Sequence, residues 1–465
     1  ESEEEVAVMT HRMAVGVWVG LFSCAAMAAD LTKMPLCTAS GIQDYPAIDG
    51  GIVVWHDERE GTLNTNIYGY SFSEPNELVI CTKMGNQTFP SVSGSIVVWQ
   101  DERNDGGDIY GFDLSTRQEF VICQHSGSQI NPRISGPIVV WQDKRAGNFD
   151  IYGYDLNTKE EFVISNGSAF EGYPAIDWPW VVWLDLRNGG NWDIYAKNLQ
   201  TGEEIAVCTN SANQSHPAVS REIVVWEDER NKSTNGFDLY GRQLPDGAEF
   251  VVCNQMGDQV LPSIDGSLVV WEDWRNGSSN LDVYGFDLAT GILLAVDTSI
   301  YSQCRPAVSN NRIVWRSGND LYYADVVAPT VLTILQPNGG EMLLAGSAAD
   351  ILWQTEGPSP DYIRIGYSAD NGQTWTTITP GVPNTGVFHW EPLPDLDSTQ
   401  CLVRIFDPAD SSKTDKSDAV FTIFQCDGAL TADLNGDCFV NLGDFSVLAT
   451  QWLQCGNPYN SQWCF

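Results

Sequence analysis

A segment built around the tripeptide Val-Val-Trp recurs through the first two thirds of this chain. The copies end at Trp55, Trp99, Trp141, Trp183, Trp226 and Trp271, and a shortened Ile-Val-Trp ends at Trp315. Successive tryptophans are 42 to 45 residues apart, and each copy lies downstream of a proline. A fixed period of this size is the signature of a repeat architecture. The period therefore constrains the fold more strongly than any local pattern does.

One repeat contains four short runs that are typical of β-strands. In the second copy these are residues 90–94, 96–99, 108–112 and 119–123, which are separated by polar, turn-forming residues. No helical periodicity is present in the repeat. Four short strands in about 43 residues match one blade of a β-propeller, so the sequence predicts an all-β fold.

The two ends of the array predict how it closes. The seventh copy stops at Ala328-Pro329 without a fourth strand. Residues 34–38 (Met-Pro-Leu-Cys-Thr) align with residues 78–82, which form a fourth strand, but no first three strands precede them. Since closure removes exposed sheet edges, we expect the N-terminal strand to complete the last blade. The sequence predicts a seven-bladed propeller over residues 30–327.

Charge and the N-terminal segment indicate export. The formal net charge of −37 excludes a nucleic-acid partner, because phosphate binding needs clustered Lys and Arg. Residues 1–29 are interpreted as a signal peptide, with a charged start, a short apolar run and a small-x-small site ending at Ala28. Residues 1–8 precede Met9 and are interpreted as upstream translation. Secretion or cell-surface display is expected, with a lipoprotein anchored at Cys24 as the alternative, and no transmembrane segment is predicted.

Nine of the twelve cysteines fall into two groups. Five occupy one equivalent position on successive outer strands and are expected to be small buried side chains rather than disulfides. These are Cys37, Cys81, Cys123, Cys208 and Cys253. Cys426, Cys438, Cys455 and Cys464 crowd the last forty residues, which suits disulfides in an oxidising compartment, with three pairings open.

Beyond the repeats, residues 330–424 carry about seven strand-like runs without the 43-residue period, which predicts an Ig-like β-sandwich. Within it, the segment from Ser368 to Trp375 resembles the Asp-box of sialidase-type propellers. The resemblance implies a hairpin turn in which Ser368 and Asp370 bond backbone donors and Trp375 packs beneath. We interpret this motif as structural rather than catalytic.

Residues 433–444 have the pattern of a twelve-residue calcium loop. A hard cation takes six to eight oxygen ligands, and the loop offers side chains at positions 1, 3, 5, 9 and 12 and a carbonyl at position 7. The expected ligands are Asp433, Asn435, Asp437, Phe439 (by its carbonyl), Asn441 and Asp444. Apolar residues follow at helical spacing, as a loop-then-helix unit requires. The alternative is an Asp- and Asn-rich turn without metal.

This loop and the run after it resemble a type I dockerin repeat, and residues 426–465 are interpreted as a dockerin-like module. The resemblance implies bound calcium and attachment to a cohesin-like or envelope partner. Two departures weaken the cohesin expectation. Dockerins carry two such repeats and this chain has one, and Cys438 stands at position 6, where glycine normally makes the sharp turn.

The blade pattern, a proline followed by Val-Val-Trp-x-Asp-x-Arg and Asp-Ile-Tyr-Gly, resembles the TolB-like propeller repeats of exported bacterial proteins over residues 30–327. Such propellers host binding modules, lyases and hydrolase accessory domains, so the resemblance implies fold rather than activity. The Asp-x-Arg pairs recur in six blades. One active site does not need six equal copies, so they are expected to be structural ion pairs.

Two sets of residues are candidate ligand contacts. The residue three before each proline is a glutamine or glutamate, and Gln87, Gln129 and Gln259 belong to this near-ring, with backbone bonding as the structural alternative. Trp192 and Trp274 break the repeat in face loops, where exposed tryptophan can stack on a sugar or anchor a peptide. No catalytic residue is predicted.

Together these patterns favour an exported, non-catalytic binding or scaffold protein whose propeller face binds a protein or glycan and whose C-terminal module binds calcium. The alternatives are a secreted polysaccharide lyase or glycosidase and a purely structural envelope component.

Overall fold

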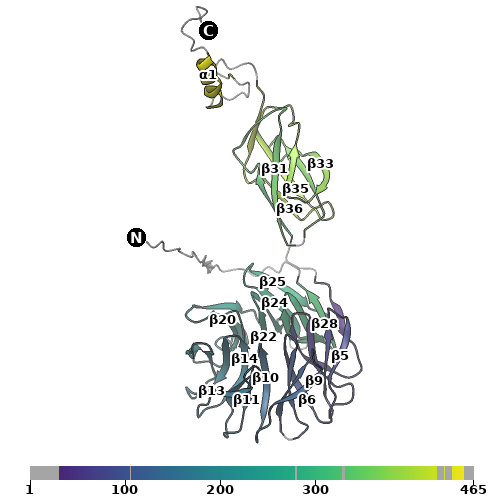
Figure 1. Cartoon of the computed structure of the whole chain (residues 1–465), viewed down its shortest axis with the longest axis vertical. Helices are drawn as coiled ribbons and strands as arrows, with labels where there is room; N and C mark the ends of the chain where they lie inside the picture. The colour runs from purple at the N-terminus through teal and green to yellow at the C-terminus, as the bar shows by residue number, and fades with distance from the viewer. Residues whose placement is uncertain are drawn as a thin grey trace, which may run out of the picture. The chain divides into compact units, whose positions relative to one another are not determined.

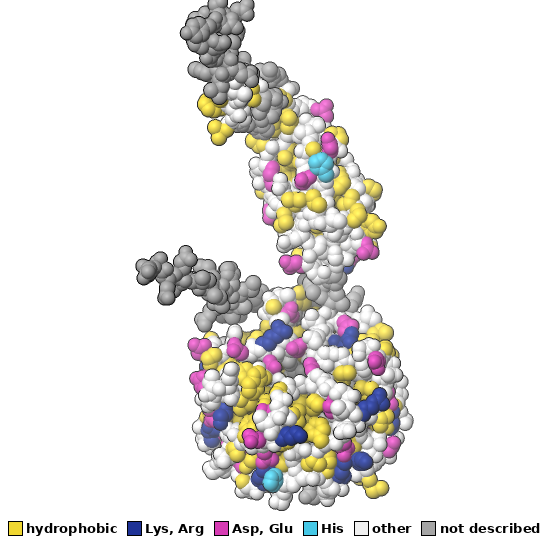
Figure 2. Space-filling model, in the orientation of Figure 1, with side chains coloured by type: hydrophobic (Ala, Val, Ile, Leu, Met, Phe, Trp, Pro, Cys, Tyr) yellow, Lys and Arg dark blue, Asp and Glu magenta, His cyan; other side chains and the backbone are white. Residues whose placement is uncertain are grey.

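The protein is almost entirely β-sheet (Figure 1). Figure 2 shows that Lys and Arg side chains are scattered among acidic and apolar ones over the visible face of the first unit. The computed structural model describes residues 31–426, except 105, 278, 279, 327–329 and 358, together with 434 and 442–454. The chain divides into two compact units, Glu1–Val326 and Val327–Phe465. The predicted signal peptide lies outside the described residues. So do all but Asp444 of the predicted calcium ligands.

The described part of the first unit contains seven four-stranded antiparallel sheets, which are the blades of a β-propeller. Six blades take their strands consecutively from the chain. The first two are β2 (Gln43–Asp49), β3 (Ile52–Asp57), β4 (Asn66–Ser71), β5 (Asn76–Cys81) and β6 (Gln87–Ser93), β7 (Ile96–Asp101), β8 (Asp108–Asp113), β9 (Gln118–Cys123). The next two are β10 (Gln129–Ser135), β11 (Ile138–Asp143), β12 (Asp150–Asp155), β13 (Glu160–Ser165) and β14 (Glu171–Asp177), β15 (Trp180–Asp185), β16 (Asp193–Asn198), β17 (Glu204–Cys208). The fifth and sixth are β18 (Gln214–Ser220), β19 (Ile223–Asp228), β20 (Asp238–Gln243), β21 (Glu249–Cys253) and β22 (Gln259–Asp265), β23 (Leu268–Asp273), β24 (Asp282–Asp287), β25 (Ile292–Asp297).

The seventh blade is closed by the N-terminal segment, as predicted. Its strands are β26 (Gln303–Ser309), β27 (Arg312–Ser317), β28 (Asp320–Asp325) and β1 (Met34–Cys37). β1 pairs antiparallel with β28, and Met34 lies opposite Tyr323. The outer position that the last repeat leaves empty is therefore filled from the other end of the chain. Closure therefore leaves no unpaired strand edge where the two ends of the array meet.

The first strands of the blades surround a common centre. β2 contacts β6 and β26, and each later first strand contacts the one before it and the one after it, so the contacts form a closed cycle. We call these seven the inner strands. The second strand of each blade is the Val-Val-Trp segment, whose β-branched and aromatic residues favour a pleated, buried strand. Val53, Val54 and Trp55 have no exposed surface, since both faces of a blade are covered by its neighbours.

The hydrophobic core lies between blades rather than within them. Val54 and Ile67 of the first blade belong to the same cluster as Val97 and Trp99 of the second. Each blade thus buries its apolar faces against the blades on either side of it, which explains why the repeat is needed in several copies.

The second unit contains two sheets that share one core, with Ile351 and Trp353 from one sheet packed with Ile365 and Val403 from the other. The three-stranded sheet has the order β29 (Val331–Gln336), β31 (Ala349–Glu356), β34 (Val387–Trp390). The other has the order β30 (Met342–Leu344), β37 (Phe421–Phe424), β35 (Ser398–Phe406), β32 (Tyr362–Ser368), β33 (Thr376–Pro383), with β36 (Thr414–Lys416) paired to β35. A helix, α1 (Leu442–Gln454), begins within the last three positions of the predicted calcium loop.

Candidate functional site

The repeated Asp-x-Arg pair forms the centre of a brace at one end of each blade. In the second blade the Trp99 indole N–H donates to Asp101 at 2.8 Å, and the Arg103 guanidinium donates to the same carboxylate at 2.6 Å. Arg103 also pairs with Glu119 of the outer strand at 2.7 Å, and its Cζ lies 4.2 Å from the centre of the Tyr110 ring. Asp101 has no exposed surface, so its charge depends on these partners.

The brace repeats in six blades, which confirms the prediction of structural ion pairs. The pairs are Asp57/Arg59, Asp101/Arg103, Asp143/Arg145, Asp185/Arg187, Asp228/Arg230 and Asp273/Arg275.

The cysteine column extends the brace to the preceding blade. Arg103 donates to Cys81 Sγ at 3.2 Å, and Arg145 donates to Cys123 Sγ at 3.2 Å. Both thiols are buried, and burial raises the pKa of each to about 12. The cysteines are therefore buried thiols that accept a guanidinium hydrogen bond, and the expectation that they form no disulfide with one another is confirmed.

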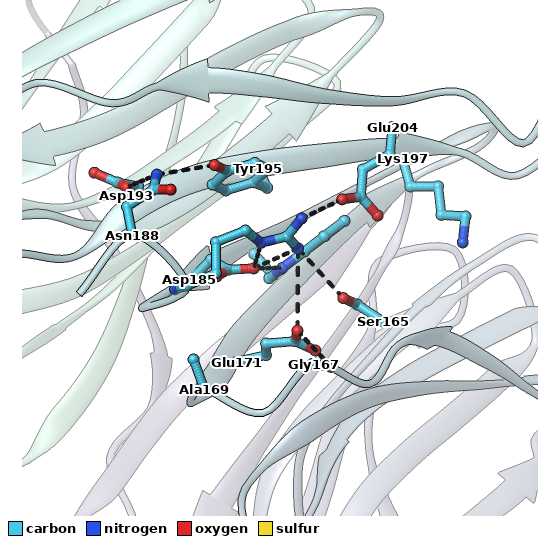
Figure 3. Close-up of polar contacts among 12 residues, drawn as sticks. Ser165, Gly167, Ala169, Glu171, Asp185, Asn188, Asp193, Tyr195, Lys197 and Glu204 are labelled. Atoms are coloured by element: carbon cyan, nitrogen blue, oxygen red, sulfur yellow. Dashed lines mark hydrogen bonds and ion pairs between the residues drawn. The ribbon is translucent and has the colours of Figure 1, made fainter.

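The fourth blade carries the same brace with two substitutions (Figure 3). Ser165 replaces the cysteine, and its hydroxyl accepts from the Arg187 guanidinium at 3.5 Å. Glu171 replaces the glutamine, lies 4.0 Å from the same guanidinium, and has its pKa raised by burial. Asp185 and Glu204 are the other two carboxylates that pair with the Arg187 guanidinium. All these contacts are internal, so this acidic cluster braces the blade.

The glutamine near-ring is buried. Gln87, Gln129 and Gln259 have no exposed surface. Their amide groups donate to the carbonyls of Gly85, Gly127 and Gly257 at 2.9, 3.1 and 2.7 Å, which closes the connection leading into each inner strand. The burial favours the structural alternative for this column, because no side-chain surface is left for a ligand.

The two tryptophans that break the repeat lie at this same end of the propeller, but in the fourth and sixth blades. Trp192 is 41% exposed, and its backbone N–H donates to Asn213 Oδ1 at 3.1 Å. Trp274 is half-buried, and its backbone N–H donates to Asp258 at 2.9 Å. Each backbone N–H is thus held by a connection that leads into an inner strand, and of the two indoles Trp192 offers the larger exposed surface.

A third set, which the sequence reading missed, is the residue immediately before each inner-strand proline. We call these seven residues the inner ring. They are Tyr45, Phe89, Asn131, Tyr173, His216, Leu261 and Arg305. All have positive φ, between 44° and 54°. The Gln or Glu two residues earlier and the proline that follows repeat from blade to blade, whereas this position holds tyrosine twice and otherwise a different residue in each blade. The position between the Gln or Glu and the inner ring also changes; it is Asp44, Thr88, Ile130, Gly172, Ser215, Val260 and Cys304. That contrast between constant and changing columns is visible in the sequence.

The inner-ring backbone is strained. A positive φ is uncommon outside Gly, Asn, Asp and His, and a following proline restricts the residue further. Of the seven, Asn131 and His216 belong to these tolerant types. Each bulky member therefore carries a local penalty of about 1 kcal/mol or more. The register of every inner strand shifts at this point, so the positive φ belongs to a bulge that all seven blades share.

Polar side chains of the second strands connect the inner ring. Gln142 accepts from the Tyr173 N–H at 2.8 Å, Glu227 accepts from the Leu261 N–H at 2.6 Å, and Glu272 accepts from the Arg305 N–H at 2.8 Å. Between the seventh and first blades, Arg316 pairs with Asp44 at 2.7 Å. Gln142, Glu227 and Glu272 each stand between the Trp and the Asp of their repeat, and Asp44 lies on the inner strand β2.

Neighbouring inner-ring side chains also contact each other directly. Tyr45 and Phe89 pack edge to face with ring centres 4.6 Å apart, and Tyr173 and His216 do so at 5.0 Å. The Arg305 guanidinium lies 4.2 Å from the centre of the Tyr45 ring. Tyr173 is 41% exposed, so part of this set is open to solvent.

The electrostatics around the inner ring are unsymmetrical. The fifth, sixth, seventh and first blades supply Glu227, Glu272, Arg316 and His56 beneath it, whereas the second to fourth supply Gln100, Gln142 and Leu184. Burial raises the pKa of Glu272 and lowers that of His56 to about 4. Perturbed groups gathered at the centre of a propeller are typical of a functional site.

Two features lie apart from this site. A groove of about 600 Å³ runs between the second and third blades, lined by residues such as Phe120 and Tyr154 from repeated columns. In the second unit, the Ser368 hydroxyl donates to Asp370 at 2.7 Å, and Asp370 accepts from the Thr374 N–H at 2.8 Å. The Asp-box-like segment is thus a self-satisfied turn, as predicted.

The predicted calcium loop is described only in part. Asp444 is 3% exposed and accepts from the Leu434 N–H at 2.8 Å. Asp433, Asn435, Asp437, Phe439 and Asn441 lie outside the described residues. In the part of the chain that is described, no helix is both long and apolar enough to cross a membrane.

No protein family and no curated protein matches the chain. Similar solved structures include the propeller domain of the Trilobed protease from Pyrococcus furiosus, at 13% identity and TM-score 0.48, covering 62% of this chain and 94% of that one. TolB from Acinetobacter baumannii is 14% identical with TM-score 0.39, covering 59% and 64%. An oligogalacturonate lyase from Vibrio parahaemolyticus is 14% identical with TM-score 0.48, covering 65% and 95%. These likenesses are too distant to assign an activity.

Proposed function

We propose that this protein is an exported binding protein whose ligand, a glycan or a peptide segment, contacts the inner ring. The observation that carries the proposal is the contrast within each Gln-x-x-Pro segment. The glutamine or glutamate and the proline repeat in all seven blades, while both residues between them change, and of these two it is the one before the proline that is held at positive φ. Function on a repeated scaffold is expected where the repeat is broken.

The chemistry of the ring supports such a ligand. Tyr45, Phe89 and Tyr173 offer aromatic surface, and Asn131 and His216 offer hydrogen-bonding groups. Aromatic surface combined with a few placed polar groups is typical of ligand sites. Trp192, at the same end of the propeller, is a further candidate contact.

A binding experiment with the full-length protein tests this proposal. Saturable binding is expected to at least one member of a panel of polysaccharides and unstructured peptides, and a Tyr173→Ala/His216→Ala variant is expected to bind at least tenfold more weakly. Tyr362→Ala, which removes a 56% exposed aromatic residue in the second unit, is the matched control. Equal affinity of the ring variant and the control would place the ligand elsewhere.

The second candidate function is catalysis on a polysaccharide. It is favoured by the raised pKa of Glu272, since a carboxyl group with raised pKa can act as a general acid near neutral pH. New reducing or unsaturated ends released from the same panel would support it, and Glu272→Gln should then abolish release without abolishing binding.

Attachment through the C-terminal module completes the proposal. The calcium loop pattern and the helix that begins at its end, α1, support a dockerin-like unit that binds calcium and holds the protein to a surface partner. Export through the predicted signal peptide places that partner outside the cytoplasm.

A further inference from the structure

One residue on the inner strands differs sharply from its counterparts. The position after each inner-strand proline is small in six blades and is Arg133 in the third. The six small residues are Ala47, Ser91, Ala175, Ala218, Ser263 and Ala307. Because the inner strands contact each other around the centre, Arg133 introduces a long cationic side chain where the scaffold otherwise keeps space.

Arg133 has no acidic partner. Among the described residues, no carboxylate lies within ion-pair distance of its guanidinium, which donates to the Pro132 carbonyl at 2.9 Å. Burial lowers the pKa of Arg133, as expected for a cation without a counter-ion. An arginine nevertheless stays charged, and the Arg133 side chain is only part-buried, so this unpaired cation is open to an anion from solvent.

A second guanidinium near Tyr45 belongs to Arg305, a member of the inner ring. It stacks 4.2 Å from the Tyr45 ring centre, and Tyr45 is also the titratable group close enough to Arg133 to act on its pKa. No described carboxylate forms an ion pair with Arg305 either. Burial raises the pKa of Tyr45, so its hydroxyl keeps its proton and can donate a hydrogen bond.

We propose that Arg133, Arg305 and Tyr45 form the anion-binding part of the inner ring and that they take the carboxylate of a small monovalent ligand. Two guanidinium groups and a phenol match a carboxylate, which accepts several hydrogen bonds in one plane. The proposal rests on the inner ring being the ligand site and names the chemistry it selects.

Charge balance favours a monovalent anion over a phosphate. Asp44 already neutralises Arg316 at 2.7 Å, and the carboxylates of Glu227 and Glu272 lie beneath the same part of the ring. Together with the net charge of −37, these acids oppose a divalent anion. The flat aromatic surfaces of Tyr45 and Phe89 next to the guanidinium groups suit a carboxylate carried on a flat or cyclic body.

The test measures benzoate, benzamide and inorganic phosphate binding to the full-length protein by calorimetry and ligand-observed NMR at constant ionic strength. Benzoate is expected to bind saturably, at least tenfold more tightly than benzamide or phosphate. Arg133→Ala, which restores the small residue of the other blades and should not disturb folding, is expected to weaken benzoate binding at least tenfold. Arg221→Ala, at an exposed turn, is the matched control.

Each other outcome overturns the assignment. Unchanged benzoate affinity in Arg133→Ala, or no benzoate binding by the wild-type protein, removes the carboxylate site. Tighter binding of phosphate than of benzoate removes the choice of a monovalent anion. Benzamide binding as tightly as benzoate, with loss in Tyr173→Ala/His216→Ala, leaves the inner ring as a ligand site and shows that the carboxylate assignment is wrong.

Discussion

Lys33 and Asp297 form an ion pair of 2.5 Å that joins the N-terminal segment to the outer strand of the sixth blade. The pair replaces a missing brace. The seventh blade has Ser317 where six blades have the aspartate of Asp-x-Arg, so the Trp315 indole donates instead to Asp297 at 2.9 Å. Lys33 supplies the cation and also donates to Ser317 at 2.9 Å. The terminus therefore closes the ring by side chains as well as by β1.

Lys33→Met is expected to destabilise the protein because it leaves the buried carboxylate of Asp297 without its cation. We expect a loss of about 2 kcal/mol in the free energy of unfolding of the propeller, measured by urea denaturation. Lys232→Met is the control, since the Lys232–Glu229 pair is exposed and should contribute less than about 0.5 kcal/mol. Equal effects of the two substitutions would contradict a role for Lys33 in closure.

The same pair predicts a pH dependence. Burial alone would raise the pKa of Asp297, but hydrogen bonds from Lys33, Trp315 and Ser299 outweigh it and hold that pKa below its ordinary value. A carboxyl group with a lowered folded pKa stabilises the fold above its unfolded pKa of about 3.9, and this contribution is lost as pH falls through the folded pKa. Removing Lys33 also removes one of the contacts that lower this pKa, so the stability difference between wild type and Lys33→Met should be largest near neutral pH, shrink as pH falls, and vanish once Asp297 is protonated in both proteins. A difference that persists undiminished at pH 2 would show that the ion pair is not its source.

Much of the propeller follows from the sequence because its information is repeated. The Val-Val-Trp period predicts the blades, and the unmatched strand around Met34 predicts the closure. The Lys33–Asp297 pair was not predictable, since 264 residues separate its members and no repeat contains it. Lys33 and Asp297 come together, and so replace the missing brace of the seventh blade, only once the ring has closed.

The inner ring escaped prediction for a different reason. Local preferences argue against positive φ before a proline, so the Gln-x-x-Pro segment reads as ordinary extended strand. The predicted ligand contacts Trp192 and Trp274 lie in face loops, whereas Arg133 differs from its counterparts in the other blades at a position inside a strand. The glutamines are predicted ligand contacts because they form a near-ring. A residue that repeats in every blade belongs to the scaffold, however, and the structure buries these glutamines.

Arg103→Met tests the repeated brace. It leaves the buried Asp101 carboxylate with an indole donor but no cation, and we expect a loss of about 3 kcal/mol in the free energy of unfolding. Arg117→Met, at an exposed hairpin turn of the same blade, should change stability by less than about 0.5 kcal/mol. Because the brace reaches Cys81 of the preceding blade, hydrogen exchange should rise in both blades and not in the second alone.

Calcium binding is the prediction for the C-terminal module. The full-length protein is expected to bind one tightly held Ca²⁺ by calorimetry, and Asp433→Ala/Asp437→Ala should abolish this binding because the loop loses two carboxylate ligands. Asp410→Ala removes an acidic residue of the second unit outside the loop and should leave binding unchanged. Unaltered binding in the loop variant would show that the metal, if taken up, binds elsewhere.

The buried cysteine column should be chemically silent in the folded protein. The reactive form of cysteine is the thiolate, and burial raises the pKa of Cys81, Cys123 and Cys208 to about 12. At pH 8 the thiolate fraction is therefore negligible, and iodoacetamide should not modify these residues within hours. Peptide mapping after urea unfolding should show complete alkylation at all three, since their pKa then returns to about 8.5. In Arg103→Met, Cys81 loses its guanidinium donor and its place in the brace, so local opening should make it the first of the three to react. Fast native-state alkylation of wild-type Cys81 would show that the blades separate far more readily than their shared core allows.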